Sequence, residues 1–415
     1  MRFFTGSIRG RYWTLRLGLI LSVSLMLTFQ TPARAETEIK RSISLDSGYI
    51  PSIGSVRSFW NFGHELEDFG GLLFDAVSEE TFFGHNPLTR LLWATGMVFG
   101  WSYQQSAFFL ANHEYGHGAR TTAAGGTASY GFSNGTGTHD FIFLYYLAAL
   151  PKTGGGYAVG SGTDLSKTPP QWGLATSAGG VNNSMNLAEY FEHQIHNQRG
   201  HLLSFNLYYL SKLDSAFYAT STLAGQTFNG GSGDIANVVN SYALQGHSIS
   251  VGDIQVGGFA AFLASATTYS YAYSFFKYLF TGDPSVESPH LGDFQVPNVS
   301  HFLNMEGISF RFNSGIRGGE GRWPFSLEVQ YKGKFAVEVG VGHEIEPGFS
   351  WMLYANSFPA LGGRANYSVN FGKSSKFNLT LAAYQLNLFE GQRVSQNHLS
   401  SAIGLEGSVR YSVLY

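Results

Sequence analysis

Residues 405–415 have the sequence LEGSVRYSVLY. From 405 to 413, leucine, glycine, valine and tyrosine occupy the odd positions, whereas glutamate, serine and arginine occupy the even ones. Successive side chains of a β-strand point to opposite faces, so this alternation predicts a strand with one apolar and one polar face. Because a single strand is not stable alone, the segment predicts an antiparallel sheet in the C-terminal part of the chain.

The same alternation occurs upstream of this strand. Residues 325–331 lead through Lys332-Gly333-Lys334 into residues 335–341, which predicts a hairpin. Residues 367–371 and 377–381 predict a second hairpin, and segments 308–312 and 349–358 add further strands. We therefore expect about seven strands in a β-domain covering residues 291–415.

The end of the chain carries a family resemblance. Alternating apolar residues that finish on an aromatic, here Tyr415, resemble the terminal strand of bacterial outer-membrane β-barrels. The resemblance implies a barrel-like antiparallel domain with an apolar face toward membrane lipid and a polar face toward a lumen. A soluble antiparallel sheet with one buried face alternates in the same way and stays open as an alternative.

The beginning of the chain has the features of a secretory signal. Four arginines precede an apolar stretch at 17–29, and Ala33-Arg34-Ala35 follows as a small-residue cleavage site. This pattern predicts that residues 1–35 are a signal peptide and places the protein in the bacterial cell envelope. With the barrel-like ending, we expect the outer membrane rather than the inner membrane or the periplasm. An uncleaved anchor is the alternative, but the stretch is short for a hydrocarbon core of about 30 Å.

Between these segments, residues 36–290 predict an α-rich domain. Their apolar residues come in long blocks, Asn86-Pro87 has the pattern of a helix start, and residues 91–112 contain no charge. Residues 254–276 are also uncharged. Both segments also contain small and polar residues, so their sequences are compatible with either a membrane span or a buried helix. The predicted fold class is α+β, an α-rich domain followed by an antiparallel barrel-like domain.

Composition narrows the function classes. Charged residues make up 13% of the chain, against about 25% in an average soluble protein, and aromatic residues make up 16%. The absence of cysteine excludes disulfides, thiolate metal ligands and thiol catalysis. The formal net charge of −3 argues against a nucleic-acid partner.

One short motif carries chemistry, His113-Glu114-Tyr115-Gly116-His117. On a helix, positions i and i+4 share one face, so both imidazoles can bind one Zn²⁺ while the glutamate reaches a water on the metal. Chance gives about 0.02 occurrences of H-E-x-x-H in a chain of this composition. The motif therefore predicts a zinc-dependent hydrolytic site with Glu114 as general base.

Three segments resemble site-2 proteases, the intramembrane zinc metalloproteases. They are the motif at 113–117, the stretch AGGVNN at 178–183 and the stretch NLYYLSKLD at 206–214. They occur in the order and approximate spacing of that family's H-E-x-G-H, A-G-P-x-x-N and N-x-x-P-x-P-x-L-D-G motifs. The prolines of the second and third motifs are missing here, and Ser215 replaces the final glycine.

The resemblance implies roles for individual residues. His113, His117 and Asp214 would bind zinc, Glu114 would be the base, and Asn183 or Asn206 would hold the substrate. The helical spacing leaves a second candidate for the third ligand. Glu189 shares a polar stripe with Asn182, Asn186, His193 and His196 if residues 181–197 form a helix. A solvated helix face is the structural alternative for this stripe.

Taken together, these features predict a cell-envelope zinc metallohydrolase. We expect a membrane-associated metalloprotease that cleaves a peptide or protein substrate. Two alternatives remain, a non-enzymatic outer-membrane β-barrel acting as a pore or adhesin, and a zinc-dependent lipid hydrolase. Since the same site can hydrolyse an ester or an amide, the motif does not choose between peptide and lipid.

Overall fold

The structure is a computed structural model. It describes residues 42–47, 56–81, 84–132, 138–150, 155–197, 200–226, 233–318, 321–345, 348–371 and 375–414. The predicted signal peptide and the terminal Tyr415 lie outside the described residues.

An antiparallel sheet of twelve strands dominates the C-terminal part of the described chain, in the order β1-β17-β15-β14-β13-β12-β11-β10-β8-β7 with β9 and β16 off this path. The long strands are β9 (Asn298–Asn304), β10 (Gly307–Gly318), β11 (Gly321–Gly333), β12 (Ala336–Ile345), β13 (Phe349–Asn356), β14 (Ala360–Phe371), β15 (Ser375–Gln385) and β17 (Ile403–Leu414). The short ones are β1 (Ser42–Asp46), β7 (His290–Leu291), β8 (Phe294–Gln295) and β16 (Asn397–His398). Both predicted hairpins are confirmed, as β11–β12 and β14–β15.

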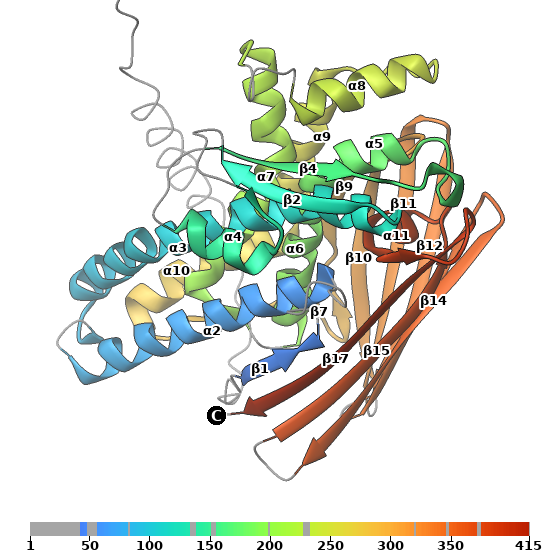
Figure 1. Ribbon diagram of the computed structural model, residues 1–415. Coiled ribbons are helices and arrows are strands. Elements are labelled where there is room, and N and C mark those ends of the chain that lie inside the picture. Colours follow the sequence, from blue (N-terminus) through green and yellow to red (C-terminus); the bar gives the residue numbers. More distant parts are fainter. Residues whose placement is uncertain are drawn as a thin grey trace, which may run out of the picture.

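The prediction of a barrel-like sheet is wrong in one respect, because the sheet is not closed. Among the described residues β1 and β7 lie at opposite ends of the strand order, and neither pairs with the other. The last strand, β17, is an interior strand that pairs with β15 on one side and with β1 on the other. The N-terminal region thus contributes a strand to the C-terminal sheet (Figure 1).

The two faces of the sheet differ in polarity, as the alternation predicts. In β11, Ser326, Glu328 and Gln330 are buried, whereas Leu327 and Tyr331 are exposed. The long strands from β10 to β17 repeat this arrangement, whereas β9 is wholly buried; the exposed apolar residues include Phe312, Val339, Val341, Leu353, Tyr367, Leu381, Val409 and Tyr411. The polar face is therefore the inner one, and the apolar face points away from the rest of the protein.

Helices gather on one side of the sheet (Figure 1). They are α2 (Val56–Glu80), α3 (Pro87–Ala123), α4 (Ile142–Ala149), α5 (Trp172–Ser177), α6 (Gly179–His196), α7 (Phe205–Leu223), α8 (Asp234–Leu244), α9 (Val251–Ala264), α10 (Ala266–Thr281) and α11 (Phe389–Val394). Helix α2 packs on β1, and α6 and α9 pack on β9. These helices cover strands near both ends of the sheet, where backbone groups would otherwise be open to pairing.

Two smaller sheets complete the fold. One has the order β3-β2-β4, from Thr138–His139, Thr127–Phe132 and Gly156–Ser161, and the other pairs β5 (Gly200–His201) with β6 (Ser285–Val286). Sheet β3-β2-β4 packs along α3.

Helix α3 begins as its sequence predicts. The side chain of Asn86 accepts hydrogen bonds from the backbone of Leu88 and Thr89, and Pro87 occupies the first helical position. The uncharged segment 254–276 is divided between α9 and α10, with Ser265 between them. No helix among the described residues combines the length and the apolar character that a membrane span requires.

Candidate metal centre

The two histidines of the motif lie next to each other on α3. Their Nε2 atoms are 3.4 Å apart. This pairing follows from the helix, because residues four apart lie one above the other on the same face.

A carboxylate from a distant part of the chain completes the group. Oδ2 of Asp234, the first residue of α8, lies 3.1 Å from Nε2 of His117 and 3.4 Å from Nε2 of His113. At zinc–ligand distances of about 2.0–2.1 Å, tetrahedral geometry places neighbouring ligand atoms about 3.3 Å apart. The three atoms are spaced as three corners of a zinc tetrahedron. Zinc enzymes use three protein ligands in this way and keep the fourth position for water or substrate.

The other ring nitrogens are held by hydrogen-bond acceptors. Nδ1 of His113 lies 2.7 Å from Oδ2 of Asp214 on α7, and Nδ1 of His117 lies 2.8 Å from the carbonyl oxygen of Thr176 on α5. Since a carbonyl oxygen accepts but does not donate, Nδ1 of His117 carries the proton, and Nδ1 of His113 faces the carboxyl group of Asp214 in the same way. This tautomer leaves the Nε2 lone pairs for a metal ion, as in carboxylate–histidine–zinc sites.

Close helix packing shapes the space in front of the Nε2 atoms. Helix α6 passes α3 at Gly180, where a Cβ would lie 2.5 Å from Nε2 of His117 and closer still to that of His113. At Gly116 a Cβ would overlap the carbonyl oxygen of Gly179. Glycine at these crossings lets the helices approach, and at Gly180 no side chain fits against the ligand atoms.

The electrostatics of the cluster suit a divalent cation. Burial lowers the pKa of His113, but the charge and hydrogen bond of Asp214 outweigh it, so this pKa is raised well above its ordinary value. Burial favours the neutral form of Asp234, yet the attraction of His117 and hydrogen bonds from both histidines lower its pKa. The carboxylates thus hold protons on the imidazoles, and metal binding releases such protons from its ligands.

Glu114 lies beside this cluster in a buried position. Burial raises the pKa of its carboxyl group, and the charges of His113 and His117 partly offset that effect. A Cβ at Gly156, the first residue of β4, would lie 3.3 Å from Cγ of Glu114 and would overlap the hydroxyl group of Tyr145. That buried hydroxyl group has no hydrogen-bond partner among the described residues.

Of the two predicted third ligands, neither lies with the Nε2 atoms. Asp214 is in the site, but its carboxylate bonds Nδ1 of His113. Glu189 accepts a hydrogen bond from Asn313 at 2.7 Å and pairs with Arg311 at 3.3 Å, both on β10. Nine residues along α6 separate it from Gly180, a rise of about 13 Å. The polar stripe predicted at 181–197 lies on α6 as expected, and its residues Glu189, His193 and His196 bond the inner face of the sheet.

The two predicted substrate-binding asparagines are engaged by protein groups. Asn183 donates to the carbonyl oxygen of Asn112 at 2.6 Å and accepts from Nε1 of Trp60 at 3.2 Å. It therefore ties α6 to α3 and α2. Asn206 donates to Oε1 of Gln105 at 3.1 Å, two turns of α3 before the motif. No described contact places either amide at the Nε2 atoms of the histidine pair.

Sequence reasoning did not find Asp234. It follows Gly233 at the start of a helix, and an acid in a first turn favours the helix dipole, so its local pattern indicates capping. Position 180 carried a signal, because glycine stands there instead of the proline of the site-2 protease motif. The role of this glycine depends on the packing of α6 across α3, which brings position 180 against the Nε2 atoms of His113 and His117.

Comparison with known proteins finds no family model, no curated protein and no solved structure that matches this chain. The resemblance to site-2 proteases therefore rests on the quoted residues alone and stays a prediction.

Proposed function

We propose that this protein is a zinc metallohydrolase of the bacterial cell envelope that cleaves peptide bonds at the surface of a membrane. The observation that carries the proposal is the spacing of His113, His117 and Asp234, whose facing atoms lie 3.1–3.4 Å apart. The motif sequence supplies the two imidazoles and the neighbouring glutamate, and Gly180 keeps a side chain away from the facing nitrogen atoms.

In this proposal the residues of the cluster have separate roles. His113, His117 and Asp234 hold zinc, while Asp214 and the carbonyl of Thr176 orient the two imidazoles. A bound zinc ion would supply a Lewis acid and a water of lowered pKa. Glu114 takes the proton from the attacking water and returns it to the leaving amine. Its burial raises its pKa and so strengthens it as a base.

The small sheet beside Glu114 supports a peptide substrate. Among the described strands, β4 lies at one edge of sheet β3-β2-β4, and it begins at Gly156, directly against Glu114. Enzymes and binding domains commonly hold an extended peptide by adding it to a sheet edge. A peptide aligned with β4 would bring its backbone to the base and to the Tyr145 hydroxyl group.

The outer face of the large sheet supports a place at a membrane. Its exposed residues are apolar on every long strand from β10 to β17. A contiguous apolar surface of this extent marks a contact with lipid or with another protein. Together with the signal-like N-terminal sequence, this face points to lipid of the outer membrane as its partner.

Zinc affinity of three carboxylate variants tests the ligand assignment. We expect Asp234→Asn to lose most of its zinc affinity. Asp214→Asn should lower the zinc affinity by only about 10- to 100-fold, because Asp214 orients the ligand His113 and does not bind the metal itself. Glu189→Gln, on the sheet side of α6, serves as the matched control and should bind normally. Metal content and competition with a chelator measure this. A purified parent chain that binds no zinc would overturn the proposal. Normal zinc binding by Asp234→Asn would favour Asp214 as the third zinc ligand.

A charge on the outer face of the sheet tests the membrane contact. Leu353 on β13 is 57% exposed on this face, and Leu244 on α8 is 90% exposed elsewhere. Arginine on a lipid-facing strand costs about 2–4 kcal/mol at the bilayer midplane. We expect Leu353→Arg to lower the fraction of protein recovered with membranes, and Leu244→Arg to leave it unchanged. Equal recovery of both variants would exclude lipid contact at this face.

A further inference from the structure

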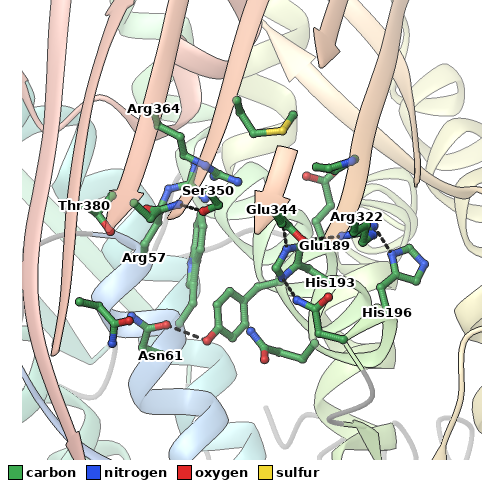
Figure 2. Close-up of a pocket in the computed structure, with 18 of the residues that line it drawn as sticks. Arg57, Asn61, Glu189, His193, His196, Arg322, Glu344, Ser350, Arg364 and Thr380 are labelled. Atoms are coloured by element: carbon green, nitrogen blue, oxygen red, sulfur yellow. Dashed lines mark hydrogen bonds and ion pairs between the residues drawn. The ribbon is translucent and has the colours of Figure 1, made fainter. Parts of the chain in front are cut away.

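A second site lies away from the metal centre, between α2, α6 and the polar face of the large sheet. It is a cavity of about 550 Å³, within the range of about 300–1,000 Å³ typical of small-molecule sites. The polar stripe of α6 forms one wall, and side chains from β10 to β15 and β17 form the opposite one (Figure 2).

The wall of this cavity is rich in charge. Six arginine and lysine side chains and four glutamates line it. Each glutamate has a basic partner: Glu189 pairs with Arg311, Glu192 with Lys212, Glu344 with Arg322, and Glu390 with Arg57. The acidic groups are thus neutralised within the protein.

Arg364 differs from the other arginines of the wall. It lies on β14 opposite Ala382 and Met352, and its side chain extends into the cavity (Figure 2). Within the described ranges it makes no ion pair, and its Nε atom is buried without a hydrogen-bond partner. A guanidinium is always charged and offers five N–H donors. Arg364 therefore forms no ion pair among the described residues, although its charge helps to lower the pKa of Glu344 and of Glu390.

A second hydrogen-bond donor in the same cavity also lacks a partner within the described chain. Asn186 on α6 is 4% exposed, and its Nδ2 atom has no hydrogen-bond partner among the described residues. A buried amide nitrogen without a partner costs about 1–3 kcal/mol. Both Arg364 and Asn186 lack an acceptor, so the missing group is an acceptor, and the charge of Arg364 selects an anion.

The rest of the wall indicates a ligand larger than a simple ion. Hydroxyl and amide side chains of β13, β14 and β15 face the cavity, among them Ser350, Asn366, Asn378 and Thr380. We propose that this cavity binds a small polar organic anion whose carboxylate or phosphate group pairs with Arg364, with Asn186 as a further hydrogen-bond donor of the wall. The site is independent of zinc and of hydrolysis.

Calorimetric titration of the full chain tests this site with two probes and one control compound. N-acetylglycylglycine carries a carboxylate, glycerol 3-phosphate carries a phosphate, and N-acetylglycylglycinamide carries no charge. We expect at least one anion to bind and the amide not to bind. The stronger anion identifies whether the source is a carboxylate or a phosphate. No binding of either anion at millimolar concentration would overturn the proposal.

Variants locate the binding. Arg364→Gln should weaken the anion by about 10- to 100-fold, since it removes a charge-assisted hydrogen bond. Lys334→Gln is the matched control, because Lys334 is 54% exposed and pairs with Glu306 outside the cavity. Asn186→Asp adds a negative charge to the wall and should also weaken binding of the anion. It provides the test of the site if Arg364→Gln does not fold. Unchanged affinity in the folded cavity variants would exclude this site.

Discussion

Replacing Glu114 with glutamine is expected to leave zinc bound and to lower hydrolysis by about 10²- to 10⁴-fold. Glutamine keeps the shape and the hydrogen-bonding capacity of the side chain, but it cannot accept the proton of the attacking water. The zinc ligands of the proposal are His113, His117 and Asp234, so metal content should stay at the level of the parent chain. Hydrolysis is measured with the zinc-loaded protein in detergent or lipid.

Two comparisons make this experiment decisive. Glu287→Gln provides the same chemical change at an exposed glutamate that pairs with Lys277, far along the chain from the motif, and should retain full activity. Fluorogenic peptides and ester lipids are offered to the same preparation. Peptide cleavage that depends on Glu114 supports the protease, and ester cleavage that depends on it supports the lipid hydrolase. Turnover that Glu114→Gln leaves intact would remove Glu114 from the mechanism.

Substituting alanine for Gly180 is expected to abolish tight zinc binding. The new Cβ would lie 2.5 Å or less from the Nε2 atoms of His113 and His117, so the imidazoles must move apart or the methyl group must occupy the space of the ion. Either outcome destroys the spacing of about 3.3 Å that tetrahedral zinc requires. Zinc content after dialysis and a chelator titration measure the loss.

Helix propensity makes Gly180→Ala a stringent test. Gly180 is in the first turn of α6, and alanine has a higher helix propensity than glycine, so the change is not a general helix disruption. Gly173→Ala in α5 is the matched control, because a Cβ there meets no atom within 4 Å. Normal zinc affinity in a folded Gly180→Ala chain would contradict the placement of the ion at the Nε2 atoms, while leaving the role of Glu114 to be judged separately.

Several features of the fold were predictable from the sequence because they depend on neighbouring residues. The N-cap Asn86 with Pro87 begins α3, and the alternation in 325–341 and 367–381 gives two hairpins. The period of the helix likewise brings His113 and His117 together. Each of these follows from an interaction over a few residues, for which the pattern along the chain contains the necessary information.

The faces of the sheet were only partly predictable. Alternation separates apolar from polar side chains, but it is the same whether the apolar face is buried or exposed. The packing of α6 on the polar face decided this, since Glu189, His193 and His196 bond the sheet and leave the apolar side outward. The pairing of β1 with β17, which joins the two ends of the described chain, has no local signal either.

By itself, the sequence determined the elements and the pair of imidazoles, and the tertiary structure decided what completes the two sites. Asp234 lies 117 residues beyond His117 and reaches it only because α8 packs against α5, α7 and α9. Asp214, which the resemblance to site-2 proteases implies as a zinc ligand, instead lies at Nδ1 of His113. The cavity around Arg364 exists only where α6 and the sheet meet. Periodicity specifies which way a side chain points within its own element, whereas a ligand set depends on distances between elements, which only their packing defines.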